Sequence, residues 1–498
     1  MSSPRFKPIC LVLAIAITFG AGEYRCPAQA EMGTSGSSGS LQLPKLCMPV
    51  SYRQVPTIAP IKTKIEMLGD RYIEVGEALQ GWNETGVPLV GKFNDRWEAV
   101  PCGDDTGLFY IVPLLARQTG WSADRSLDAF LLGMIVVSAT AGLAGLWLTA
   151  SGVWPRILAV VPIASAAYLA YKLGDVYVVQ GSVVLISIPW LLYALKAGVR
   201  SWLRCLIVFL SGISLGLAQW IRTQSGSPVL VFFAILVCFS SLRRSIKILL
   251  SATLLIGMSL PLLYEQFPLH ERERFLVTHR RGYQPTLNHH LFWHTAYLGL
   301  SYLNNPYVTA WRDLSAVQYV QAVDPTVIYG GEKYEALLRS RVEDIIHRDH
   351  QFIFYTVAAK AGVLACMLLL CINIGLAASI SCPKSLGTEL AFWLATTFAA
   401  LPGIIAIPVP QYVLGMITMA LLYWYYSVSF YVERCSERPA KTGTAVWGAC
   451  GGSKSNQEAA DRTSMSDPST TAIAQQPSLH RSSAFNALRF AFGASHHE

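Results

Sequence analysis

The sequence predicts an all-α fold, a polytopic bundle of about ten transmembrane helices with a large external loop domain. Of its 498 residues, 52% are hydrophobic and 14% are charged, which is too apolar and too poor in charge for an ordinary soluble domain. Apolar runs of spanning length also recur along the chain. The net charge of +8 does not indicate nucleic acid as a partner, because the Lys and Arg residues fall between these runs instead of forming one basic face.

The apolar runs set the predicted spans. After a short first run, Ile9–Gly22, they cover residues 128–150, 156–172, 176–195, 203–220, 226–242, 246–264, 353–379, 387–408 and 411–432. The sequence leaves open whether residues 1–22 form an uncleaved transmembrane helix or a signal segment, since Ala28-Gln29-Ala30 has the small residues of a cleavage site.

Basic residues in the short loops predict the orientation. They fall on one side of the predicted spans, as the positive-inside rule requires: Arg156, Lys196, Arg200, Arg204, Arg243, Arg244, Lys247, Lys384 and Arg434. We therefore expect a multi-pass protein of a bacterial-type inner (plasma) membrane, with an active external face. Residues 23–127 form a first external loop with an interfacial helix, 128–264 a helix bundle, 265–352 a large external loop, 353–432 the C-terminal spans and 433–498 a disordered cytoplasmic tail.

Two adjacent carboxylates, Asp104 and Asp105, stand just before the apolar and aromatic run that contains Tyr110 and leads to the first strong span. Burying a carboxylate in lipid costs several kcal/mol. A pair at the membrane boundary is therefore either a solvated helix cap or faces a polar cavity where it acts. The residues alone leave both interpretations open.

The large loop gathers basic and aromatic residues. Arg280 and Arg281 could hold phosphate through charge-assisted hydrogen bonds, or lie in a solvated turn. The segment that follows mixes rings with hydrogen-bonding groups, which suits sugars but is also typical of packing: His289, His290, Trp293, His294 and Tyr297. His290 and His294 are four positions apart, but no third ligand lies at helical spacing, so we predict no metal site. A divalent cation at Asp104 or Asp105 stays an alternative.

The order of these features resembles the GT-C superfamily of integral-membrane glycosyltransferases, including the protein O-mannosyltransferases and the lipid A aminoarabinose transferase. The similarity lies in an acidic pair at the end of the first external loop with an aromatic residue after it, an outer-face Arg222 in the run Gly216–Arg222, and a large external loop after the seventh span. It covers residues 100–360. The segment before Asp104 is longer than is usual in that superfamily.

The resemblance implies chemistry on a polyprenyl-phosphate-linked sugar, with inversion at the anomeric carbon. It implies Asp104 as the base that accepts the proton of the acceptor, which would be a glycan, lipid or protein. Asp105 would orient the acceptor or a cation, and Arg222 would bind the leaving phosphate. Further help could come from Arg280, Arg281, His294 and Lys360.

Two other classes of function stay open. The main one is a transporter or flippase of a lipid-linked or anionic solute, with Arg222 and Lys360 as binding charges. The other is a membrane scaffold whose large loop binds a protein partner. Each basic residue also has a structural interpretation, because Arg222 or Lys360 could extend to the polar boundary without binding a ligand.

Overall fold

The computed structural model describes residues 64–93, 96–100, 105–280, 283, 285–287 and 290–437. This part of the chain is mostly helical, and its apolar helices make the chain a multi-pass membrane protein. The first apolar run and the segment after residue 437 lie outside the described residues. The predicted start of the tail at residue 433 falls inside the last described helix, α16 (Leu414–Glu437).

Six helical segments among the described residues are long and apolar enough to cross a membrane. They are α4 (Ala123–Thr149), α5 with α6 (Val153–Leu158 and Val160–Leu173), α8 (Ser201–Ile221), α10 (Arg244–His279), α14 (His350–Ser381) and α15 (Leu386–Ile405). Each covers one of the predicted spans. The predicted spans 176–195 and 226–242 correspond to shorter helices, α7 (Val178–Ala194) and α9 (Ser227–Phe239). A helix rises about 1.5 Å per residue, so α9 falls short of a hydrocarbon core of about 30 Å. The count of ten spans stays a prediction.

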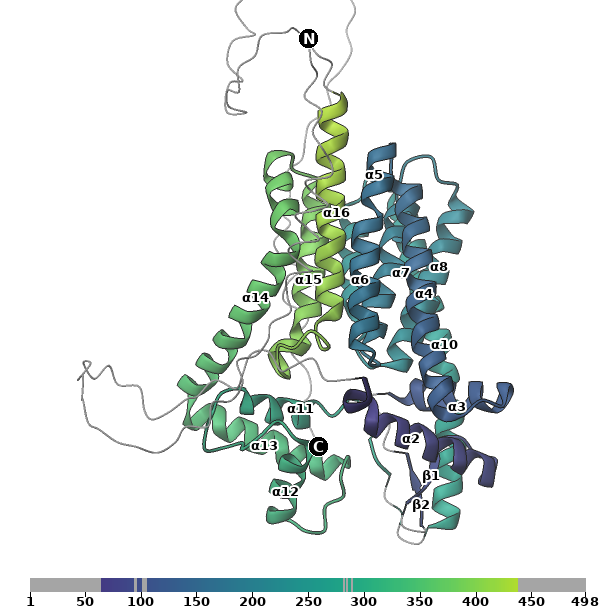
Figure 1. The fold of residues 1–498 in the computed structure, drawn as a ribbon, viewed down its shortest axis with the longest axis vertical. Helices are drawn as coiled ribbons and strands as arrows, with labels where there is room; N and C mark the ends of the chain where they lie inside the picture. The colour runs from purple at the N-terminus through teal and green to yellow at the C-terminus, as the bar shows by residue number, and fades with distance from the viewer. Residues whose placement is uncertain are drawn as a thin grey trace, which may run out of the picture. The chain divides into compact units, whose positions relative to one another are not determined.

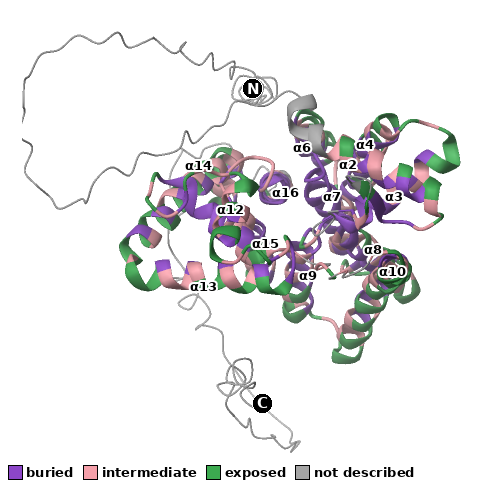
Figure 2. Ribbon diagram, turned by 90° about the horizontal axis from the view of Figure 1, so that it is seen from below, coloured by how far each residue is buried: buried purple, intermediate pink, exposed green. Residues whose placement is uncertain are grey.

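Helix α7 forms the centre of the bundle. Most of its side chains are buried, and it packs against α4, α8 and α16 (Figure 2). A helix that is apolar on every side is expected in such a place, because it has no polar face for water. The residues just before its first turn, Asp175 and Tyr177, are buried as well.

The contact of α8 with α10 brings two backbones unusually close. A Cβ atom added at Gly212 would lie 2.4 Å from the Leu254 carbonyl oxygen, and one at Gly216 would lie 2.3 Å from that of Met258. Small residues four positions apart allow this close approach between membrane helices. Since α8 ends next to Arg222, the contact also fixes where this arginine lies relative to α10.

The segment before the first span departs from the predicted all-α fold. Between α2 (Lys64–Thr85) and α3 (Thr106–Thr119), it contains an antiparallel hairpin of β1 (Val90–Phe93) and β2 (Arg96–Ala99). β1 packs on α2, and Trp97 of β2 packs edge-on against Phe275 of α10, with 6.0 Å between ring centroids. Strands of four residues are too short to give an alternating pattern that can be distinguished from a loop.

The predicted large loop is helical and has a hydrophobic core of its own. The boundary at residue 265 falls inside α10, which continues to His279. After it come α11 (Phe292–Gly299), the 3-10 turn η1 (Leu300–Tyr302), α12 (Asp313–Val323) and α13 (Glu332–Arg348). Tyr297, Val320 and Leu338 are among the buried residues that join these helices. Helix α13 buries one face, with Tyr334, Leu338, Val342 and Ile345, and carries charged residues on the other.

Both polar parts of the chain lie at the same end of the helix bundle. The α2–α3 segment and the α11–α13 unit both lie at that end, away from the loop between α4 and α5 (Figure 1). Near that loop, Lys196 donates to the Thr149 carbonyl oxygen and Glu433 accepts from the Ser151 N–H. The orientation of these two ends relative to a membrane stays a prediction.

Candidate functional site

An ion-pair cluster stands where α3, α8 and α2 meet. Arg222 donates from Nη1 to Oδ1 of Asp105 at 2.6 Å. Arg71 donates to the other oxygen, Oδ2, from Nη2 at 3.0 Å and from Nε at 3.3 Å. The Asp105 side chain is only 7% exposed. Among the sequence-predicted site residues, Asp105 and Arg222 are thus in direct contact.

Asp105 occupies the N-cap position of α3 but its side chain does not cap the helix. Its main-chain carbonyl accepts from the Phe109 N–H at 3.2 Å, while its carboxylate is committed to the two guanidinium groups. Gly107 makes this possible, because a Cβ there would lie 2.8 Å from backbone atoms of Trp220 and Ile221. The solvated-cap interpretation is therefore wrong for Asp105, whereas Asp104 lies outside the described residues.

Arg222 ends α8, and its main-chain N–H donates to the Ala218 carbonyl oxygen at 2.9 Å. A cation is favourable at this end of a helix because the carbonyl dipoles point toward it. Besides Asp105, the guanidinium donates from Nη2 to the Tyr177 hydroxyl at 2.7 Å and lies 4.3 Å from the centroid of the Tyr177 ring. These contacts hold Arg222 inside the protein, since the residue is only 9% exposed.

Arg71 of α2 was missed by the sequence analysis. Besides its bonds to Asp105, its Nη1 lies 3.4 Å from Oδ1 of Asp175, and the same Asp175 oxygen accepts from the Val176 N–H at 2.6 Å. Burial by itself would lower the pKa of Arg71, but Asp175 and Asp105 outweigh burial and hold this pKa above its usual value. In the sequence, Asp175 stands between two apolar runs, where a carboxylate needs a cationic partner, but nothing there names Arg71 as that partner.

An aromatic chain connects the cluster to the large loop. The Tyr177 ring meets the Tyr412 ring edge-on at 4.7 Å, and Tyr412 meets Trp311 at 6.0 Å between centroids. Tyr412 belongs to the connection between α15 and α16, and Trp311 to the segment between η1 and α12. The large loop therefore reaches the cluster through Trp311, a residue outside its histidine-rich segment.

Tyr110 of α3 is packed among other aromatic side chains. Its ring packs between Trp82 and Trp220, with centroid distances of 5.3 and 5.4 Å, and its hydroxyl is 2.8 Å from that of Tyr264. Burial, and then the bond to Tyr264, raises the pKa of Tyr110, so it stays a neutral phenol. Next to Tyr264, Glu265 is hydrogen-bonded to Thr106, the residue after Asp105.

His294 is a core residue of the α11–α13 unit. Its Nδ1 lies 2.7 Å from the Tyr334 hydroxyl and its Nε2 lies 3.1 Å from Oδ1 of Asp313, so both ring nitrogens have protein partners. The main-chain N–H groups of Trp293 and His294 both donate to Glu335 at 2.9 Å. The hydrogen bonds of His294 to Tyr334 and Glu335 thus also hold α11 on α13.

The remaining aromatic and histidine candidates also lie around α11. The Tyr297 hydroxyl donates to the Tyr307 carbonyl at 3.2 Å, and Trp293 lies under the Arg339 guanidinium at 5.7 Å. His290 precedes α11 and is partly buried, and His289 lies outside the described residues. These contacts make Tyr297 and Trp293 packing residues, and none of them joins the Asp105–Arg222 cluster directly.

The other basic candidates are separate from the cluster. Lys360 is 2% exposed and donates to the carbonyl oxygens of Ile404 at 2.9 Å, Ile405 at 3.3 Å and Ala406 at 2.6 Å. Because an ammonium has three N–H donors, these bonds leave none for a phosphate. Arg280 lies 3.3 Å from Glu98 of β2. Arg281 lies outside the described residues.

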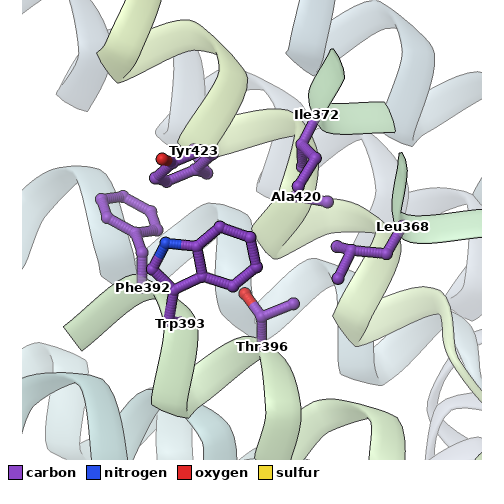
Figure 3. Close-up of a pocket in the computed structure, with 7 residues that line it drawn as sticks. All are labelled: Leu368, Ile372, Phe392, Trp393, Thr396, Ala420 and Tyr423. Atoms are coloured by element: carbon purple, nitrogen blue, oxygen red, sulfur yellow. The ribbon is translucent and has the colours of Figure 1, made fainter. Parts of the chain in front are cut away.

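Within the described ranges, no three His, Cys, Asp or Glu side chains come together as a metal site. A shallow pocket lies between α14, α15 and α16 (Figure 3). Its lining is mostly apolar and aromatic: Leu368, Ile372, Phe392, Trp393, Thr396, Ala420 and Tyr423. None of the sequence-predicted site residues lines it.

No protein-family model, curated protein or solved structure matches this chain.

The chemistry of the site centres on largely buried ion pairs. Arg71, Asp105, Asp175 and Arg222 form a chain of two cations and two anions joined by side-chain bonds. Guanidinium groups bind phosphate in the same geometry in which they bind carboxylate. The aromatic groups of Tyr177 and Tyr412 stand beside it, and such rings suit the C–H face of a sugar.

Proposed function

We propose that the protein is a membrane glycosyltransferase of the GT-C type, which moves a sugar from a polyprenyl-phosphate donor to an acceptor at the external face. The observation that carries the proposal is the pairing of Asp105 with Arg222, beside Tyr177, at the end of the bundle that bears both polar segments. A carboxylate and a phosphate-binding cation side by side are what this transfer requires.

The transfer can be written with all atoms accounted for. The acceptor hydroxyl oxygen forms a bond to the anomeric carbon from the face opposite the phosphate, which inverts that centre. The bond from the anomeric carbon to the phosphate oxygen breaks, and its electron pair stays on the phosphate. The proton of the acceptor goes to a carboxylate, for which Asp104 is the choice by resemblance. Arg222 binds the phosphate as its negative charge grows.

The test is sugar transfer by the purified protein with a panel of polyprenyl-phosphate sugars. Asp104→Asn is expected to lower turnover by about 10²–10⁴-fold, which is the usual contribution of a general base. Arg222→Gln should also lower it, whereas Arg348→Gln should not. Arg348 is a suitable control because it is exposed and pairs with Asp344 on its own helix.

Full transfer by Asp104→Asn would remove this residue from the mechanism. A transporter would instead move the lipid-linked sugar across vesicles with no change in its covalent structure. Such flux by the unmodified chain, without transfer to any acceptor, would contradict the proposed enzyme.

A further inference from the structure

The two arginines of the cluster use different oxygens of Asp105. Arg222 bonds to Oδ1 at 2.6 Å, whereas Arg71 bonds to Oδ2 through two nitrogens at 3.0 and 3.3 Å. One bond can therefore open while the other holds. An aspartate gripped by both arginines through the same oxygen would not allow this.

The described ion pairs of the cluster match each cation with an anion. Its four directly paired groups are two guanidiniums and two carboxylates, with side chains between 7% and 20% exposed. A phosphate that joins this largely buried cluster brings further negative charge to a place where water screens it poorly. It is held best where one of its oxygens takes the place of a carboxylate oxygen on a guanidinium.

Arg222 is the arginine that can change partner. Arg71 is held by two carboxylates, and one of them, Asp175, is itself fixed by the Val176 N–H. At Arg222, the Asp105 oxygen can be replaced by a phosphate oxygen of similar charge and geometry. The Tyr177 hydroxyl can stay in place during this exchange because it is neutral.

We propose that the phosphate of a lipid-linked donor displaces Asp105 from Arg222, while Arg71 retains Asp105 through Oδ2. The inference rests on the proposed function for the nature of the ligand. It makes Arg71 a positioning residue, and it gives a role to α2, part of the long segment before the acidic pair. Phosphate binding and the release of Oδ1 toward the acceptor then occur as one event.

The experiment measures binding of farnesyl monophosphate to the full chain in detergent. Asp105→Asn is expected to bind this probe about tenfold more tightly, because the amide competes poorly for Arg222. Arg222→Gln should lose most of the binding. Arg348→Gln serves as the control and should bind like the unmodified chain. Weaker or unchanged binding by Asp105→Asn would overturn the displacement.

A double-mutant cycle tests the role of Arg71. Without Arg71, Asp105 has only Arg222 as a partner and competes more strongly with the ligand. Arg71→Gln as a single change should therefore weaken binding of farnesyl monophosphate several-fold. In the Asp105→Asn background the same change should have little effect. An equal loss in both backgrounds would mean that Arg71 binds the phosphate itself, which contradicts its role as a positioning residue.

An infrared measurement decides the question even if Asp105→Asn does not fold. In the unmodified chain, farnesyl monophosphate should shift a carboxylate stretching band, and this band should move in Asp105→Glu. Binding with no change in a carboxylate band would contradict the proposal. Inorganic phosphate is the second probe, and equal effects of both probes would point to free phosphate as the ligand instead of a lipid carrier.

These readouts are independent of turnover. If the chain transfers no sugar but the binding results hold, the glycosyltransferase proposal fails and the displacement stands. If transfer occurs but Asp105→Asn does not tighten binding, the displacement fails alone.

Discussion

Arg222 and Lys360 are both buried cations in a membrane protein, yet their surroundings differ in kind. Arg222 donates to the side chains of Asp105 and Tyr177, whereas Lys360 donates to three main-chain carbonyl oxygens at the end of α15. A side chain can rotate away from a cation. A carbonyl at a helix end can leave only if the backbone moves.

The difference shows that burial of a charge does not by itself indicate a binding site. By exposure alone, Lys360 at 2% would be the stronger candidate than Arg222 at 9%. The partners reverse that order, because those of Arg222 are side chains that can rotate, whereas those of Lys360 are main-chain carbonyl groups. His294 resembles Lys360 in having a structural role, since the hydrogen bonds of its ring hold α11, α12 and α13 together.

The largest expected effect on stability is that of Arg222→Met. Removal of one member of a buried ion pair leaves its partner without compensation, so the free energy of unfolding should fall by about 3–5 kcal/mol. Unfolding of the detergent-solubilised protein by a denaturing detergent would measure it. Adding Asp105→Asn should recover part of the loss. A double variant less stable than Arg222→Met would show that the pair is not coupled as described.

A smaller loss is expected for Lys360→Met. The change keeps the length of the side chain but leaves the carbonyl groups of residues 404–406 without their donor, at a cost of about 1–3 kcal/mol. Lys172→Met is the control, because Lys172 is exposed and should change stability by less than about 0.5 kcal/mol. Farnesyl monophosphate binding should stay unchanged in both. A loss of binding in Lys360→Met would make Lys360 a ligand-binding residue after all.

The smallest effect is expected for His294→Gln. The amide can keep one of the two ring hydrogen bonds, so the free energy of unfolding should fall by about 1 kcal/mol. Burial raises the pKa of Tyr334, which therefore stays protonated as a partner for either side chain. Transfer and phosphate binding should be close to those of the unmodified chain. A selective loss of transfer, with stability retained, would return His294 to the site.

Part of the site could be predicted from the sequence. Asp105 and Arg222 stand at the ends of apolar runs, where a charge is conspicuous and costly, and both proved to be in contact. Arg71 could not be found in this way, because it lies in a polar segment where another basic residue has no special meaning. The role of α11 could not be predicted either, because a sugar site and a packed core give the same pattern of histidine and aromatic residues.

By itself, the sequence determined the class of protein and most of the spanning helices, because a run of apolar side chains in a self-bonded helix is what lipid requires. It also determined which charges were expensive enough to need partners. Only the tertiary structure decided who the partners are. Asp105 is 117 positions from Arg222 and 34 from Arg71, and no local periodicity reports distances between residues so far apart in the chain.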